Sequence, residues 1–147
     1  MTSETSRRGT RPRSLAVTTW LRLMRVHQKL ERAAADDLRN AGLSVPQFDI
    51  LGHLAAADGI TQQELAEARL TTKGNLSQLL EAMEGCGLIE RVRDGRAKRV
   101  FLASRGRELL REVLPGHEAM IEAKLCPLSA DEQTQLRSLL RRLDRAL

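Results

Sequence analysis

The sequence predicts a mainly α-helical protein that carries one small β-hairpin. Leucine and alanine dominate its 147 residues and aromatic residues make up only 2% of them, a composition that favours helices over a β-sandwich or barrel. Apolar residues recur at helical spacing along most of the chain. Between two β-prone runs, the pair Asp94-Gly95 tolerates the positive φ angles of a tight turn and therefore predicts the hairpin.

The first helix is expected after a polar N-terminal segment. Residues 1–13 are rich in arginine and lack apolar periodicity, which predicts a disordered basic tail. Ser14 can cap a helix over about residues 15–40, in which apolar side chains recur on one face. The stretch Asn40-Ala41-Gly42 is a helix stop.

Three short helices follow, and each has its own start signal. Ser44, with a proline two residues later, opens the first of them. Thr61 and Glu64 form a capping box that opens the second, because each side chain can satisfy a free backbone N–H group of the other. Thr71 or Thr72 begins the third.

The hairpin carries a high concentration of positive charge. Its basic residues are Arg91, Arg93, Arg96, Lys98 and Arg99. The alternation along its strands is expected to turn Val92, Val100 and Leu102 inward and Arg91, Arg93 and Arg99 outward. Crowding of like charges costs stability in the free protein, and nearby phosphates would relieve it. The hairpin therefore predicts an anionic partner, in agreement with a formal net charge of +5.

Two longer helices are expected at the C-terminal end. Ser104 begins a helix that runs to about Leu125, and Pro115-Gly116 should kink or interrupt it. A capping box of Ser129 and Glu132 opens the last helix. An apolar stripe follows on that helix, formed by Leu136, Leu139, Leu140, Leu143 and Leu147.

The order of these elements is that of a winged helix-turn-helix. A helix, a short helix, a tight turn, a third helix and a charged hairpin follow one another within residues 43–103. In such a module the second helix of the pair enters the major groove of DNA, and the hairpin flanks it. The sequence therefore predicts that double-stranded DNA is the anionic partner.

The chain resembles the MarR family of transcriptional regulators in three stretches, GLSVPQFDIL, GITQQELAEARLTTKGNLSQLLEAMEGCGLIERV and DGRAKRVFLASRGREL. The resemblance is strong over residues 43–103 and looser over 15–147. It implies a homodimer whose first and last helices intertwine, so that residues 14–42 and 104–147 form the dimerisation region. Asp94-Gly95-Arg96 matches the family's Asp-x-Arg signature, which implies that Arg96 lies at the wing tip near the minor groove.

DNA contacts are expected from three parts of the module. The candidates are Thr72, Lys73, Asn75, Ser77 and Gln78 on the third short helix, Gln62 at the start of the second, and Arg93, Arg96 and Lys98 on the hairpin. Asn75 can form two hydrogen bonds with adenine, and Lys73 can reach guanine or a phosphate. The start of a helix also favours phosphate. The alternative remains open that Thr72 is only a helix cap and that Asn75 is merely exposed.

A small-molecule site would agree with the resemblance, because ligands of the family bind between the dimer helices and the DNA-binding module. Trp20 and His27 lie one heptad apart on the first helix, and His53 lies near Phe48. These side chains could hold a small aromatic or anionic effector. In the alternative interpretation, Trp20 packs in the dimer core and His27 is a hydrogen-bonded core histidine.

No catalytic, cofactor or metal motif is found in the sequence. The patterns G-x-S-x-G, H-E-x-x-H, G-x-G-x-x-G and the P-loop do not occur, and the three histidines and two cysteines are too scattered for a zinc site. Cys86 and Cys126 form no C-x-x-C pair, which predicts a reduced, cytoplasmic setting. Cys86 remains a candidate for oxidation because Arg91 is close in sequence. No apolar run reaches the ~20 residues that cross a membrane.

The sequence therefore predicts a transcriptional regulator without enzymatic activity. We expect a homodimeric repressor that binds a near-palindromic operator sequence-specifically and is released by a small molecule. Two alternatives remain open. One is an architectural protein of the same fold that binds DNA without sequence preference, and the other is a helical adaptor whose basic hairpin docks an acidic protein.

Overall fold

The computed structural model describes residues 13–69 and 71–147, and within them the chain forms six helices and three strands. These are α1 (Leu15–Arg39), α2 (Val45–Ala56), β1 (Ile60–Thr61), α3 (Gln62–Ala68), α4 (Lys73–Gly85), β2 (Ile89–Asp94), β3 (Ala97–Leu102), α5 (Ser104–Leu125) and α6 (Ala130–Asp144). The mainly helical fold with a small β wing is thereby confirmed. The tail predicted for residues 1–13 lies outside the described residues, apart from Arg13.

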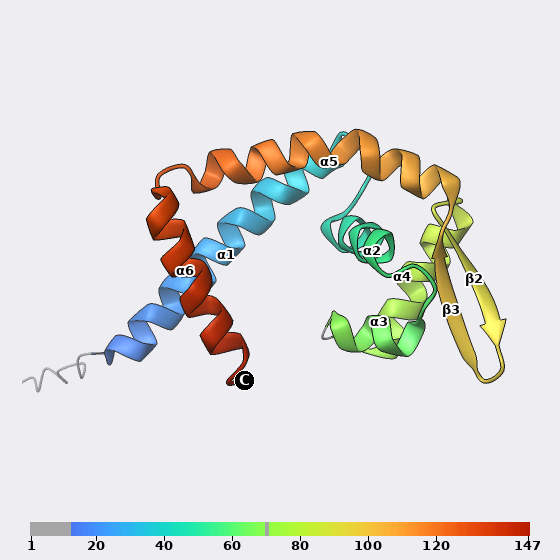
Figure 1. Ribbon diagram of the computed structural model, residues 1–147, viewed down its shortest axis with the longest axis horizontal. Helices are drawn as coiled ribbons and strands as arrows, with labels where there is room; N and C mark the ends of the chain where they lie inside the picture. Colours follow the sequence, from blue (N-terminus) through green and yellow to red (C-terminus); the bar gives the residue numbers. More distant parts are fainter. Residues whose placement is uncertain (1–12, 70) are drawn as a thin grey trace, which may run out of the picture.

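The molecule has two ends, which the long helix α5 connects (Figure 1). Helices α2, α3 and α4 and the small sheet gather at one end, and α6 and the first part of α1 lie at the other. Helix α5 starts beside the sheet and packs on both α2 and α1. The region from α2 to β3 therefore forms one module, which α5 joins to the terminal helices.

The helices begin at the start signals that the sequence predicts. Ser14 caps α1 by accepting a hydrogen bond from the backbone N–H of Val17 at 3.3 Å. Ser129 and Glu132 satisfy each other's backbone N–H groups at the start of α6. Thr72 caps α4. Because these contacts span only three residues, the local sequence is sufficient to specify them.

The sheet has three strands, whereas the sequence predicts only a hairpin. The strand order is β1-β3-β2, and β1 pairs antiparallel with β3 through Ile60–Val100 and Thr61–Arg99. A two-residue strand shows no alternation of apolar and polar side chains. Thr61 is also the N-cap of α3, so its pattern in the sequence is that of a helix start.

We call the β2–β3 hairpin the wing. Its turn lies one residue later in the chain than the sequence predicts. Asp94 pairs with Ala97 as the last strand pair, so Gly95 and Arg96 form the turn instead of Asp94-Gly95. Gly95 has a φ angle of +60°, a conformation that costs glycine little. The shift places Arg96 within the turn itself.

The inward face of the wing is also different from the prediction at two positions. Val100 and Leu102 are buried as expected, but Val92 is 51% exposed. Directly paired residues share a face of a sheet, and Arg91 pairs with Val100 whereas Val92 pairs with Arg99. Arg91 therefore lies on the buried side, and the predicted outward position of this arginine is wrong.

The sequence predicts a kink or an interruption at Pro115-Gly116. Helix α5 continues through both residues in one piece, so an interruption does not occur. A proline removes one backbone hydrogen bond of a helix and normally destabilises it there. Buried side chains on both sides of Pro115, Leu110 and His117, anchor the helix to the rest of the molecule. Tertiary packing thus outweighs the local preference.

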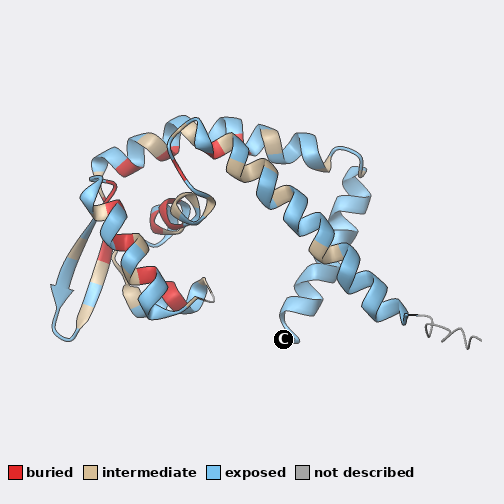
Figure 2. Cartoon of the chain, turned by 180° about the vertical axis from the view of Figure 1, so that it is seen from behind, coloured by how far each residue is buried: buried red, intermediate tan, exposed pale blue. Residues whose placement is uncertain are grey.

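The buried core lies mostly in the module at the sheet end (Figure 2). Its fully buried side chains are Leu38, Ile50, Leu51, Leu54, Leu65, Leu76, Leu80, Met83, Ile89 and Val100. Helix α6 has no buried residue, and α1 has only Leu38. Large apolar side chains on these two helices and at the C-terminal end are instead exposed, namely Leu15, Val17, Trp20, Leu21, Val26, Leu136, Leu139, Leu140, Leu143 and Leu147. A single chain therefore leaves an apolar surface on α1 and α6 uncovered.

A helix that crosses a lipid bilayer must be both long and apolar. None of the helices in the described segments meets both conditions.

Candidate nucleic-acid interface

Helix α4 is fixed to the core by one face and presents polar residues on another. Leu76, Leu80 and Met83 are buried and anchor it. Of the predicted DNA-contacting residues on this helix, Ser77 is half-buried, and the others are exposed, namely Thr72, Lys73, Asn75 and Gln78. The candidates therefore stay together on the accessible side of α4.

The start of α4 combines unpaired backbone N–H groups with positive charge. Thr72 Oγ1 accepts a hydrogen bond from the backbone N–H of Asn75 at 3.3 Å, so the threonine does act as a cap. The first turn of α4 contains no acidic residue, whereas that of α3 contains Glu64. The partial positive charge at the start of α4 is therefore not neutralised from its own first turn, and it favours an anion.

The starts of α3 and α4 lie close together. Lys73 Nζ is 3.5 Å from Gln63 Oε1, and both side chains are exposed. Gln62, which the sequence predicts as a DNA contact, is only half-exposed, and its Oε1 is buried without a hydrogen-bond partner in the described part of the chain. At the start of α3, Gln63 is thus the more accessible of the two glutamines.

The five basic residues of the wing fall into two groups. Arg93, Arg96 and Lys98 are exposed, and none of them forms an ion pair within residues 13–69 and 71–147. Arg91 and Arg99 instead form ion pairs within the chain, with Glu84 and with Asp94 respectively, and the Arg99 side chain is still 43% exposed. The three predicted DNA-contacting cations of the wing are therefore the ones without an ion-pair partner in the described part of the chain, which the sequence pattern alone could not show.

Arg91 joins the wing to the end of α4. Its Nη2 lies 3.1 Å from Glu84 Oε1, and its backbone N–H donates to Glu84 Oε2 at 2.9 Å. The Arg91 guanidinium holds the pKa of the Glu84 carboxyl below its ordinary value. Only 14% of the Arg91 side chain is exposed. This arginine is therefore part of the framework that holds the wing beside α4.

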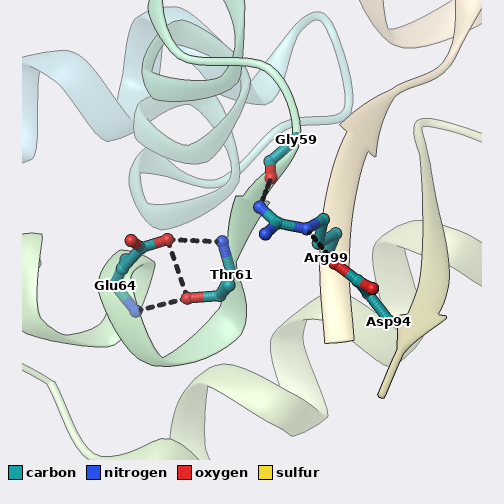
Figure 3. A network of polar contacts seen from close by, with 5 residues as sticks. All are labelled: Gly59, Thr61, Glu64, Asp94 and Arg99. Carbon is teal, nitrogen blue, oxygen red and sulfur yellow. Dashed lines mark hydrogen bonds and ion pairs between the residues drawn. The ribbon is translucent and has the colours of Figure 1, made fainter. Parts of the chain in front are cut away.

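Arg99 joins the wing to the segment before α3 (Figure 3). Its Nε donates to Asp94 Oδ2 at 2.7 Å and its Nη1 donates to the carbonyl oxygen of Gly59 at 2.9 Å. The hydrogen bond from Arg99 to Asp94 raises the pKa of the guanidinium. Nearby, the N–H and hydroxyl groups of Thr61 donate to Glu64 and lower the pKa of that carboxyl.

A hollow lies where α5 meets α1 and α2, and it has a volume of about 280 Å³. His27 lines it, together with apolar side chains that include Leu30, Met120 and Ile121. The other two predicted ligand-binding residues do not line it. Trp20 lies earlier on α1 and is 59% exposed, and His53 is half-buried on α2. The structure therefore brings only His27 of the predicted trio to this hollow.

His117 is a residue of this region that sequence reasoning missed. It is buried, its Nδ1 lies 2.9 Å from Asp37 Oδ2, and its ring centroid lies 4.4 Å from that of Phe48. It lines the hollow described above and also a second one of about 550 Å³ between α1 and α5. The available signal was its spacing of seven residues from Leu110, which places both on the buried face of α5.

Sequence comparison relates the chain to known regulators. A sequence model of the MarR family matches residues 41–100. The transcriptional regulator HosA of Escherichia coli O127:H6 is 35% identical over 104 residues, a match that covers 69% of this chain and 77% of HosA.

Structural comparison extends the likeness over nearly the whole chain. AbsC, a MarR family transcriptional regulator from Streptomyces coelicolor, superposes with a TM-score of 0.84 at 26% identity, over 93% of this chain and 97% of AbsC. A mutant MarR of E. coli, solved in complex with operator DNA, has a TM-score of 0.80 at 24% identity and coverages of 89% and 99%. A MarR family protein of Mycobacterium tuberculosis, solved with salicylic acid, has a TM-score of 0.68 at 26% identity and coverages of 89% and 96%.

Proposed function

The chain belongs to the MarR family of transcriptional regulators, and from this premise we propose that it acts as a homodimer on a near-palindromic DNA site. One observation carries the proposal. The three accessible cations of the wing, Arg93, Arg96 and Lys98, stand beside a helix whose first turn lacks acidic residues. A surface of this kind is suited to bind a polyanion of regular shape, and double-stranded DNA is such a polyanion.

In the proposed complex, α4 enters the major groove and the wing follows the adjacent backbone. Asn75 and Lys73 reach base edges near the start of α4, where Thr72 and the free N–H groups can also meet a phosphate. Ser77 and Gln78 lie further along the same helix, and Gln62 lies at the start of α3. Arg96, at the turn of the wing, reaches furthest toward the DNA.

Dimerisation is supported by the apolar surface of α1 and α6. Side chains such as Trp20 and Leu139, each 59% exposed, lie on helices that bury almost nothing within one chain. Covering them with a second copy would remove this apolar area from water, which is the main favourable term in association. A two-fold axis between the copies then predicts half-sites about one helical turn apart, ~10 bp, or a small multiple of it.

We propose further that the dimer is a repressor and that a small aromatic or anionic molecule releases it. The hollow of about 280 Å³ supports this proposal, because it lies where α5 and α1 meet α2 of the DNA-binding module. The complex of the M. tuberculosis relative with salicylic acid is an example of such a ligand in the family. An effector bound in the hollow would move the module relative to the paired helices and change the spacing of the two copies of α4.

The test measures solution mass and DNA retention with the same preparation. We expect a mass of two chains and retention of duplex DNA at low ionic strength. We also expect the protein to prefer one duplex sequence over an excess of random duplex competitor. Equal competition by random duplex would favour the architectural alternative. A mass of one chain together with no retention of duplex would contradict the proposal, and binding to an acidic protein instead would favour the adaptor.

A further inference from the structure

One side chain of β3, Arg99, connects two segments that lie far apart in the sequence. Its Nε bonds to the carboxylate of Asp94, at the end of β2, and its Nη1 bonds to the carbonyl oxygen of Gly59, just before β1 (Figure 3). The first contact spans 5 residues and the second spans 40. A planar guanidinium can serve two acceptors at fixed angles, which a lysine ammonium cannot do as rigidly.

The two segments that Arg99 holds are the ones that lead to the proposed DNA contacts. Asp94 is followed directly by the turn residues Gly95 and Arg96. On the other side, Thr61 pairs with Arg99 across the β1–β3 ladder and caps α3, which packs on α4. A displacement of either segment would therefore change where Arg96 stands relative to α4.

The position of Asp94 gives a second reason to assign a structural role to this contact. Its carboxylate is 60% exposed and adjoins the turn that carries Arg96. A negative charge at this place repels a phosphate backbone, and thus weakens DNA binding by electrostatics alone. Fixing the wing in the geometry that DNA requires would offset that cost, because a preorganised contact loses less conformational entropy on binding.

We propose that Arg99 is a positioning residue that fixes the wing against the start of α3, and that it is not itself a phosphate contact. The inference rests on the proposed DNA-binding function. The inference gives different roles to the basic residues of the wing. Arg99, together with Asp94, sets the geometry of the wing, and the exposed cations Arg93, Arg96 and Lys98 contact the DNA.

The test compares three variants for affinity to a duplex that the wild-type protein enriches from a random pool. Asp94→Asn removes a negative charge, so electrostatics alone predicts equal or tighter binding, whereas the proposal predicts binding weaker by about three- to tenfold. Arg99→Lys keeps the positive charge but loses the planar guanidinium that donates to two acceptors. It should therefore lose about as much affinity as Arg99→Gln. Asp36→Asn, in an exposed ion pair on α1, makes the same charge change elsewhere and should bind at least as well as wild type.

A second measurement uses the free protein and needs no DNA. The Arg99 Nε–H proton should give a slowly exchanging resonance in wild type that exchanges quickly in Asp94→Asn, while the circular dichroism of both proteins stays the same. Two results would overturn the inference and leave the proposed function intact. In the first, Asp94→Asn binds the duplex as tightly as wild type. In the second, Arg99→Lys binds the duplex as tightly as wild type whereas Arg99→Gln binds it more weakly. Wild-type protein that enriches no duplex would remove the proposed function itself.

Discussion

His117 Nδ1 lies 2.9 Å from Asp37 Oδ2, and the same imidazole packs against the ring of Phe48. One side chain of α5 thus contacts both α1 and α2, at the junction between the terminal helices and the DNA-binding module. The His117 side chain is only 8% exposed and that of Asp37 is 31% exposed. Removing one partner therefore leaves the other largely buried without its hydrogen bond, which is a costly state.

We expect His117→Ala to lower the free energy of unfolding by about 2–4 kcal/mol, because the packing on Phe48 is removed and Asp37 is left unpaired. Urea denaturation measures the change. His27→Ala is the matched control, because His27 is exposed on α1 and its removal should cost less than about 0.5 kcal/mol. Equal costs for the two variants would contradict the structural role of His117.

The two glycines of α5 should respond oppositely to alanine. A Cβ at Gly106 would lie against the backbone carbonyl of Leu88, whereas one at Gly116 would meet no atom within 4 Å. Gly106→Ala should cost about 2 kcal/mol or more, because backbone cannot move aside cheaply. Gly116→Ala should stabilise the protein by about 0.5–1 kcal/mol. Thermal denaturation of both variants measures these changes. Destabilisation by Gly116→Ala would contradict the prediction, because it would mean that the space beside Gly116 is occupied.

The Glu84–Arg91 ion pair should make stability depend on acid pH. The pKa of Glu84 is lowered in the folded protein, so its contribution is fully present above the ordinary pKa of 4.5 and is lost as the pH falls through the folded value. Glu84→Gln removes this contribution, and its free energy of unfolding should therefore fall less between pH 5 and lower pH than that of wild type. Denaturation at a series of pH values measures it. If the free energy of unfolding of the two proteins fell equally with decreasing pH, the result would contradict the prediction.

Arg96 should contribute to DNA affinity through phosphates. Arg96→Ala is expected to weaken binding to most sequences and to reduce the slope of log K against log salt by about 0.9 for each phosphate that the arginine neutralises in the wild-type complex. Fluorescence anisotropy over a range of salt concentrations gives the slope. An unchanged slope would mean that the wing turn does not touch phosphates.

Asn75 should contribute to base recognition. Asn75→Ala is expected to cost roughly 1–3 kcal/mol on the preferred site and little on random duplex. Competition binding with both duplexes separates the two effects. An equal reduction on both would assign Asn75 to the backbone or to folding instead of base reading.

The parts of the fold that the sequence predicts correctly depend on local chemistry. The helix starts at Ser14, Thr72 and Ser129 follow from a side chain that reaches a backbone group three residues away. The wing follows from a glycine that accepts a positive φ angle. No distant residue is needed for either interaction, so a pattern of a few letters is sufficient.

The parts that sequence reasoning missed depend on long-range contacts. The strand β1 exists because Ile60 and Thr61 pair with β3, at Val100 and Arg99, far along the chain. The register of the wing, set by the burial of Val100, decides that Arg91 is covered and Val92 exposed. A count of basic residues therefore could not separate the cations that form ion pairs within the chain, Arg91 and Arg99, from the exposed cations that form none in its described part.

The central claim is that the wing and α4 of two paired subunits together read DNA, and site selection from a random duplex pool tests it most directly. We predict enrichment of a two-fold symmetric sequence, with half-sites about one helical turn apart, ~10 bp, or a small multiple of it. Failure to enrich any sequence, or enrichment of an asymmetric site bound by one chain, would contradict the claim.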